Sequence, residues 1–180
     1  MEKDAGEAFG GDNNPTGYDY YSFYFAARNI GRLKALNLGD YQANFGQGLT
    51  LSTGLAFGKS SIITNSKRNF NGFGAYRSLR ENAYLRGGAL ALELGNITTG
   101  IFASYKKVDG NTLDEEDRDP EAPIVTTSIQ EDGGLHRTPS ELADKDAITD
   151  FQTGFYLDYK LPFGRIGTVN YLRKLSASLE

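Results

Sequence analysis

The sequence predicts an all-β protein: an antiparallel meander of about seven long strands, with long polar loops and one short helix. Three observations predict this fold class. Apolar and polar residues alternate with a period of two over several segments, as on the two faces of a strand. The 180-residue chain holds 11 Tyr, 11 Phe and 22 Gly, a composition typical of β-structure. Turn sequences such as Gly-Asn and Pro-Phe-Gly separate the alternating segments.

The first elements are expected to be an irregular lead-in and a hairpin. Residues 1–17 are polar and rich in turn-forming residues, which predicts the lead-in. Residues 18–28 predict a strand, residues 29–31 a turn, and residues 32–38 a returning strand.

A bulge or bend is expected at Gly39, where the alternation shifts by one position. The next stretch carries no charge and predicts one strand from Tyr41 to Phe57. Strands of soluble domains seldom exceed ~10 residues. From Phe45 to Phe57 such a strand spans roughly 40 Å at ~3.3 Å per residue. Tilted by ~45° it rises about 28 Å, which is close to the ~25 Å apolar band of a membrane β-barrel.

One face of this stretch is therefore expected to meet lipid, where a charge at the midplane costs ~2–4 kcal/mol. The expected lipid-facing residues are Phe45, Leu49, Leu51, Leu55 and Phe57. The other face carries Gln, Asn, Ser, Thr and Gly and is expected to line a wet or packed lumen. A soluble β-sandwich with one unusually long, bent strand is the alternative.

The remaining chain predicts one long loop and two clear hairpins. Residues 58–75 predict the loop. Strands 84–94 and 97–107 are joined by a tight Gly-Asn turn, and strands 151–161 and 165–174 are joined at Pro-Phe-Gly.

Between these hairpins the sequence becomes polar. Residues 109–123 predict an acidic loop, which lacks the spacing and central Gly of an EF-hand and is expected to be solvated rather than to bind Ca²⁺. Residues 124–129 predict a short strand. Residues 131–147 predict a loop with a short helix near 139–146, capped by Thr138 or Ser140.

Composition excludes several functional classes. The chain has no Cys, so it has no disulfide, thiolate metal site or Cys nucleophile. Its net charge of −4 argues against a dedicated nucleic-acid surface. No apolar run approaches ~18 residues, which argues against a transmembrane helix but not against a membrane barrel. We expect no catalytic residue, no metal and no cofactor.

A polar cluster of the lumen or loops is expected from Glu81, Arg86, His136, Arg137 and Glu141. His136 is the single histidine and has no nucleophile motif or second His beside it, so a structural role is expected. Arg86 interrupts an apolar strand. If it points inward, it needs an acidic partner such as Glu81, Glu93 or an acid across the lumen.

Seven short motifs occur in an order that resembles the β-barrel portion of large Bacteroidetes-type envelope proteins, which carry helix-hairpin-helix repeats near their N-terminus. The motifs are EKDAGEAF (2–9), GYDYYS (17–22), LGDYQANFGQGLTL (38–51), FGKS (57–60), YRSLRENAYLRGGA (76–89), YKKVDG (105–110) and GLHRTPSEL (134–142). The resemblance covers nearly the whole chain. It implies a bacterial outer-membrane location and no reaction.

Residues 1–180 are accordingly expected to form a single barrel segment, a fragment of a longer chain, because closing a small barrel takes at least ~8 strands. The expected function is non-enzymatic: a pore, a transport component or the membrane anchor of a larger envelope protein. The expected partners are outer-membrane lipid, the remainder of its own chain and an envelope complex, without nucleic acid. A soluble β-rich binding or adhesion module is the alternative.

Overall fold

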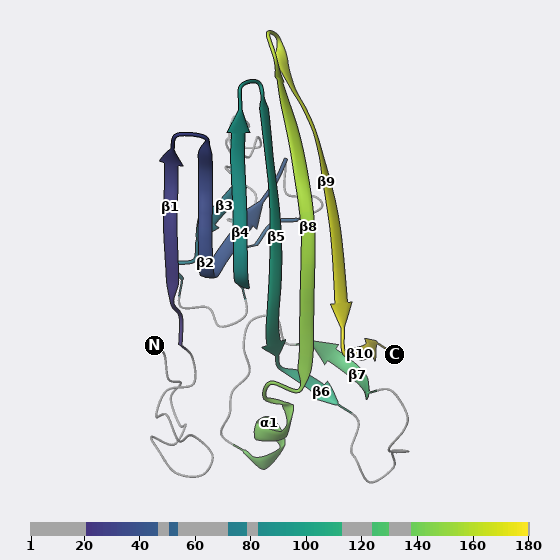
Figure 1. Cartoon of the computed structure of the whole chain (residues 1–180). Helices are drawn as coiled ribbons and strands as arrows, with labels where there is room; N and C mark the ends of the chain where they lie inside the picture. The colour runs from purple at the N-terminus through teal and green to yellow at the C-terminus, as the bar shows by residue number, and fades with distance from the viewer. Residues whose placement is uncertain are drawn as a thin grey trace, which may run out of the picture.

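The computed structural model of the chain describes residues 21–46, 51–53, 72–78, 83–112, 124–129 and 138–179. In these residues the protein is all-β, with one seven-stranded antiparallel sheet, one three-stranded sheet and one short helix (Figure 1). The expected fold class is confirmed. The main sheet is not closed, since its edge strands do not pair with each other or with any further described strand.

The main sheet has its strands in the order β1 (Tyr24–Ile30), β2 (Leu33–Asn44), β4 (Leu85–Leu94), β5 (Ile97–Val108), β8 (Ile148–Leu161) and β9 (Gly164–Leu175), with β3 (Gly72–Ala75) paired to β2. The small sheet has the order β10 (Ala177–Leu179), β7 (Ile124–Ile129) and β6 (Gly110–Thr112). The helix is α1 (Pro139–Asp144). Helix α1 has six residues, and no helix in the described part of the chain is long and apolar enough to cross a membrane.

The two ends of the main sheet differ. The tight turns of the β1–β2, β4–β5 and β8–β9 hairpins lie at one end, at the top of Figure 1. Helix α1 and the small sheet lie at the other end. We call these the turn end and the helix end. The hairpin β4–β5 and the hairpin β8–β9 confirm the two clearest sequence predictions almost residue for residue.

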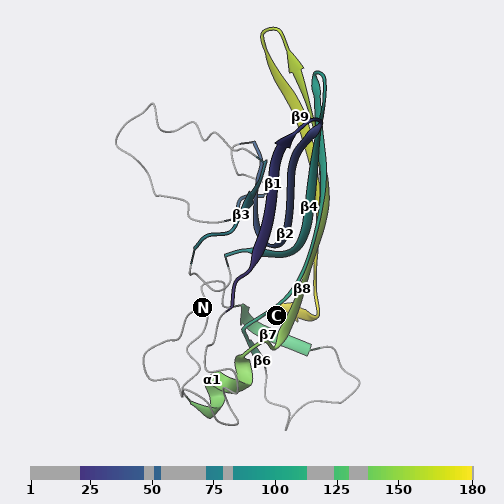
Figure 2. The same cartoon turned by 60° about the vertical axis from the view of Figure 1, so that its left-hand side comes forward.

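Strand alternation gives the main sheet two faces. On β5, Phe102 is buried, whereas the neighbouring Ile101 is 61% exposed. Strand β3 lies over one side of the sheet, as the edge-on view of Figure 2 shows, and Phe73 of β3 contacts the ring of Phe102 there. We call this side the covered face and the opposite side the open face.

Strand β2 connects the sheet to the layer that covers it. It pairs with β4 as far as Tyr41 and with β3 from Tyr41 to Asn44, so Tyr41 is paired with both strands. In Figure 1 its ribbon bends sharply and passes behind β4. Gly39 has a φ of 86°, a left-handed conformation that glycine adopts without a steric penalty. The expected shift of the alternation is wrong, because β2 pairs with β4 through Gly39 without a change of register.

The expected single strand from Tyr41 to Phe57 is wrong. Strand β2 ends at Asn44, and Gly46 turns the chain with a φ of 58°. The chain then returns, and Ser52 forms an isolated antiparallel bridge to Asn44. The alternation of the sequence does not reveal this turn, because the segments before and after Gly46 both place apolar residues on the same face of the sheet.

The lipid-facing assignment is also wrong for the two of its residues that the structure describes. Phe45 and Leu51 are buried, at 8% and 6% exposure, in the cluster on the covered face. They follow Tyr41 and Ala43, which alternation directs to that face and which are fully buried. The other three residues, Leu49, Leu55 and Phe57, lie outside the described residues.

The predicted loops are corrected in two places. Strand β3 lies within the expected loop 58–75, and β6 lies within the expected acidic loop 109–123. The predicted helix is confirmed: Thr138 is the N-cap, and its side chain and that of Glu141 form a reciprocal capping box. The lead-in 1–17 and residues 131–137 lie outside the described residues.

We expect Gly39→Ala to lower the free energy of unfolding by about 1–3 kcal/mol. A side chain is strained at this φ, and a Cβ at Gly39 would collide with the carbonyl oxygen of Phe23. Gly164→Ala is the control, because a Cβ there meets no atom within 4 Å. Urea unfolding of both variants measures the difference, and equal losses would contradict the role given to Gly39.

Candidate functional site

The open face of the main sheet is apolar and exposed. Exposed large side chains on this face come from five strands and include Phe25, Leu38, Ile101, Tyr105, Phe151, Phe155, Leu157, Tyr159, Ile166 and Leu172. They surround a shallow hollow of about 750 Å³, whose apolar lining includes Leu36, Leu90, Ile101, Phe155 and Leu172. Monomeric soluble proteins rarely expose a contiguous apolar patch larger than a few hundred Å². An exposed apolar face of this kind is typical of a surface that contacts another protein or a membrane.

Charges are absent from the middle of the open face. On β8 the outward residues from Phe151 to Leu161 are all uncharged. Ten steps of ~3.3 Å make this run about 33 Å long, or about 25 Å high at a tilt of ~40°. Tyr105 lies near the helix end, and Tyr159 near the turn end. Aromatic residues at both margins of an apolar band are typical of membrane barrels.

The covered face carries a buried polar network near the helix end. Asp150 is fully buried and accepts hydrogen bonds from Nε and Nη2 of Arg173, both at 3.0 Å. Gln152 donates to the same carboxylate at 2.6 Å, and the Tyr171 hydroxyl donates to Gln152 Oε1 at 3.1 Å. A buried charge persists only when it is paired and hydrogen-bonded, and this network meets that requirement.

Four aromatic rings cover the middle of the same face. Phe45 lies 4.5 Å from Tyr156 and 5.4 Å from Phe73 between ring centroids, and Phe73 lies 5.8 Å from Phe102. These rings join β2 and β3 to β5 and β8. The main sheet is thus packed on one face and bare on the other.

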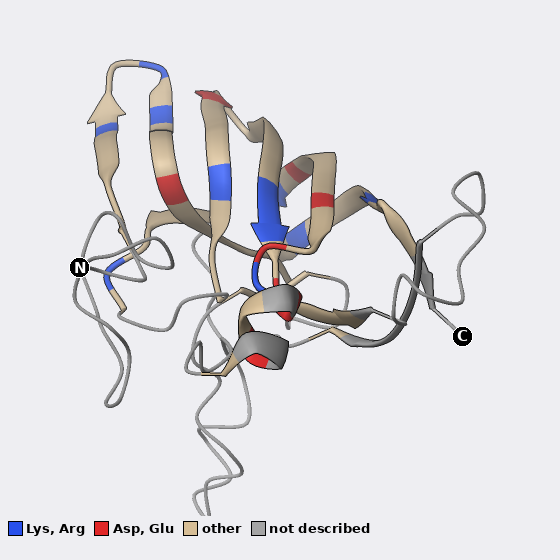
Figure 3. Ribbon diagram, turned by 90° about the horizontal axis from the view of Figure 1, so that it is seen from below, with Lys and Arg blue, Asp and Glu red and all other residues tan. Residues whose placement is uncertain are grey.

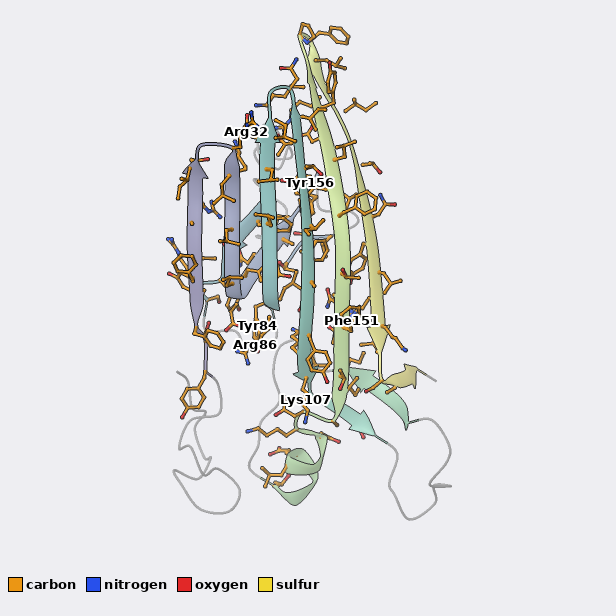
Figure 4. All side chains as sticks on the ribbon, in the orientation of Figure 1. Arg32, Tyr84, Arg86, Lys107, Phe151 and Tyr156 are labelled. Atoms are coloured by element: carbon orange, nitrogen blue, oxygen red, sulfur yellow. The ribbon has the colours of Figure 1, made fainter. Side chains whose placement is uncertain are left out.

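Arg86 has a defined partner at the helix end of β4. Its Nε donates to Asp40 Oδ1 at 2.7 Å, and its Nη2 donates to Asp40 Oδ2 at 3.0 Å. Asp40 is fully buried and also accepts from the backbone N–H of Phe23. The Arg86 guanidinium lies 4.9 Å from the Tyr84 ring centroid, which adds a cation–π contact. Figure 4 shows Tyr84 and Arg86 side by side.

Of the acidic partners expected for Arg86, Glu93 is wrong. The carboxylate that binds Arg86 comes from Asp40 on the neighbouring strand, whereas Glu93 binds Lys34 and Lys160 at the turn end. Of the other members of the expected cluster, Glu141 closes the capping box of α1. Glu81, His136 and Arg137 lie outside the described residues.

The Asp150–Arg173 pair was missed, although the sequence contained a signal for it. A two-residue turn at Pro162 fixes the register of β8 and β9, so that Leu161 faces Gly164 and Gln152 faces Arg173. Counting back from the turn places Arg173 on the same face as Asp150. Among the described residues, no three His, Asp or Glu side chains are arranged to hold a metal ion.

Comparisons with known proteins identify no relative of this chain. Models of protein families, curated proteins and solved structures were each searched, and none matches the chain.

Proposed function

We propose that this chain forms part of the wall of an outer-membrane β-barrel, with its open face against lipid and its covered face toward the lumen. The observation that carries the proposal is the open face, an exposed and uncharged apolar band that lies mostly on strands of 10 to 14 residues. The hydrocarbon chains of lipids can cover such a band, because the band needs no hydrogen-bonding or charged partner. The covered face, with its buried ion pair, suits the inner side of such a wall.

The role that fits best is a membrane anchor of a larger envelope protein. The aromatic layer of Phe45 and Phe73 lies across the covered face and packs on Phe102 and Tyr156. Such a layer narrows any lumen beside this part of the wall. This arrangement favours an anchor over a wide pore or a transport channel.

A soluble β-rich binding or adhesion module is the second candidate. The packed cluster on the covered face favours it, because this cluster resembles the core of a soluble β-protein. In that case another protein would cover the open face. The two candidates differ in how the open face tolerates charge.

We expect Ile101→Arg to block membrane assembly, at a cost of ~2–4 kcal/mol at the midplane. Ile101 is 61% exposed and pairs with Phe155 at the middle of the band. Ile166→Arg is the matched control, since Ile166 is 65% exposed but lies near the turn end. There the same charge costs only ~0–1 kcal/mol.

Recovery of folded protein in lipid vesicles measures the effect of both variants. An exposed position of a soluble protein would accept either arginine within ~0.5 kcal/mol. Equal tolerance at Ile101 and Ile166, together with a monodisperse protein in plain buffer, would overturn the membrane proposal and favour the soluble module.

A further inference from the structure

The connections between neighbouring strands of the main sheet differ in length at its two ends. At the turn end, the three hairpins close with two-residue turns, at residues 31–32, 95–96 and 162–163. At the helix end, residues 109–147 join β5 to β8, and residues 45–84 return the chain from β2 to the start of β4. The sheet therefore has one end of minimal turns and one end of long connections.

The connection from β5 to β8 carries folded structure of its own. It contains β6, β7 and α1, and β10 joins the same small sheet directly after β9. We call α1 and the small sheet the cap. Figure 3 looks onto this end of the molecule, with α1 in front of the main strands, and in Figure 2 α1 lies on the same side of the main sheet as β3. The cap thus stands at the helix end, on the side of the covered face.

Hydrogen bonds and apolar contacts seat the cap on the main sheet. Asp109 Oδ1 accepts from the backbone N–H of Asp146, two residues after α1, at 2.8 Å. The backbone N–H of Ser176 donates to the carbonyl oxygen of Thr149 at 3.0 Å, and the Ser176 hydroxyl accepts from the backbone N–H of Thr149 at 2.9 Å. Three apolar side chains from β5, β8 and β10 form a buried cluster at the same junction: Val108, Ile148 and Ala177. The cap is therefore fixed to the ends of these strands.

We propose that the helix end of the sheet faces the outside of the cell, where the cap stands above the outer membrane, and that the turn end faces the periplasm. This inference rests on the proposed membrane wall. Outer-membrane barrels have short turns on the periplasmic side and longer loops on the outer side, and the two ends of this sheet differ in the same way. The cap, on the side of the covered face, is then the part of the wall that meets the external medium over the lumen.

Cysteine labelling from outside the cell tests this orientation, because these 180 residues contain no Cys. Asn111→Cys places a thiol on β6 in the cap, and Asn96→Cys places a thiol in the turn between β4 and β5. Both asparagines are exposed, so the two variants form a matched pair. Each variant of the full-length protein is produced in bacterial cells, and the cells are treated with a polyethylene-glycol maleimide that does not cross the outer membrane.

In intact cells we expect the maleimide to label Asn111→Cys and to leave Asn96→Cys unlabelled, because only the cap meets the medium. After the outer membrane is permeabilised, both variants should be labelled, which shows that each thiol is accessible in the folded protein. Lys145→Cys, at the C-cap of α1, and Phe163→Cys, at the tip of the β8–β9 hairpin, repeat the comparison at a second position of each end.

The outcome separates this inference from the proposed function. Labelling of the turn positions alone in intact cells would overturn the orientation and leave the membrane wall supported, since the two ends would still lie on opposite sides of the membrane. Labelling of both ends in intact cells, or of neither end until the outer membrane is permeabilised, would refute the membrane wall and the orientation with it, because both ends would then lie on one side.

Discussion

Arg173→Met is expected to lower the free energy of unfolding by about 3–5 kcal/mol, because it leaves the buried carboxylate of Asp150 without its arginine partner. Asp150 has no exposed surface, and Arg173 supplies two of its hydrogen bonds. Gln152 would remain as a neutral donor at 2.6 Å, and the buried Lys106, opposite Asp150 on β5, would remain as a cation on the same face, so the loss should lie toward the lower end of this range. Methionine keeps an apolar stem of similar length, so the change tests the ion pair more than the packing.

Urea unfolding in detergent micelles measures this loss. The control is the double variant Asp150→Leu/Arg173→Met, which removes the buried charge together with its partner. Replacing both members of a buried pair by apolar residues is often neutral or stabilising, so most of the lost stability should return. A double variant as unstable as Arg173→Met would show that the pair matters through packing rather than through charge.

Phe73→Ala is expected to cost about 3–5 kcal/mol, which is typical of a large aromatic truncated in a core. Phe73 is 1% exposed, and its ring contacts those of Tyr41, Phe45, Phe102 and Tyr156. Strand β3 would then be held mainly by its pairing with β2 and by the Arg28 side chain, which donates to the Phe73 carbonyl oxygen, so the loss should loosen the covering layer.

The control for this prediction is Phe163→Ala, at the tip of the β8–β9 hairpin. Phe163 is 88% exposed, and its truncation should change stability by less than ~0.5 kcal/mol. Unfolding curves of the two variants give the comparison. A small loss at Phe73 would mean that β3 is not held by its aromatic ring.

Hairpins with tight turns were predictable because turn and alternation fix both register and face. The residues of β5 and β8 lie on the faces that alternation assigns to them. The helix was predictable from Thr138 and Glu141, whose spacing matches a capping box. These elements are specified locally.

The covering layer was not predictable because it depends on contacts between distant segments. The alternation from Tyr41 onward predicts which side chains share a face, but it does not predict that the chain turns at Gly46. Strand β3 has only four residues, two of them Gly, so no periodic signal could form. The direction of Phe45 depends on Phe73 and Tyr156, which follow 28 or more positions later in the sequence.

The outer edge of β9, with which no described strand pairs, constrains the order of assembly. Roughly every second residue of an edge strand directs its N–H and C=O away from the sheet, and β9 has 12 residues. In hydrocarbon each unsatisfied backbone group costs several kcal/mol, so the edge alone would outweigh the stability of a typical domain. If the chain forms part of a membrane wall, the sheet therefore does not enter the bilayer as a single copy with both edges bare. Its insertion would have to be concerted with the arrival of strands that pair with β1 and β9, whether they come from the same polypeptide or, in a vesicle, from further copies of this chain.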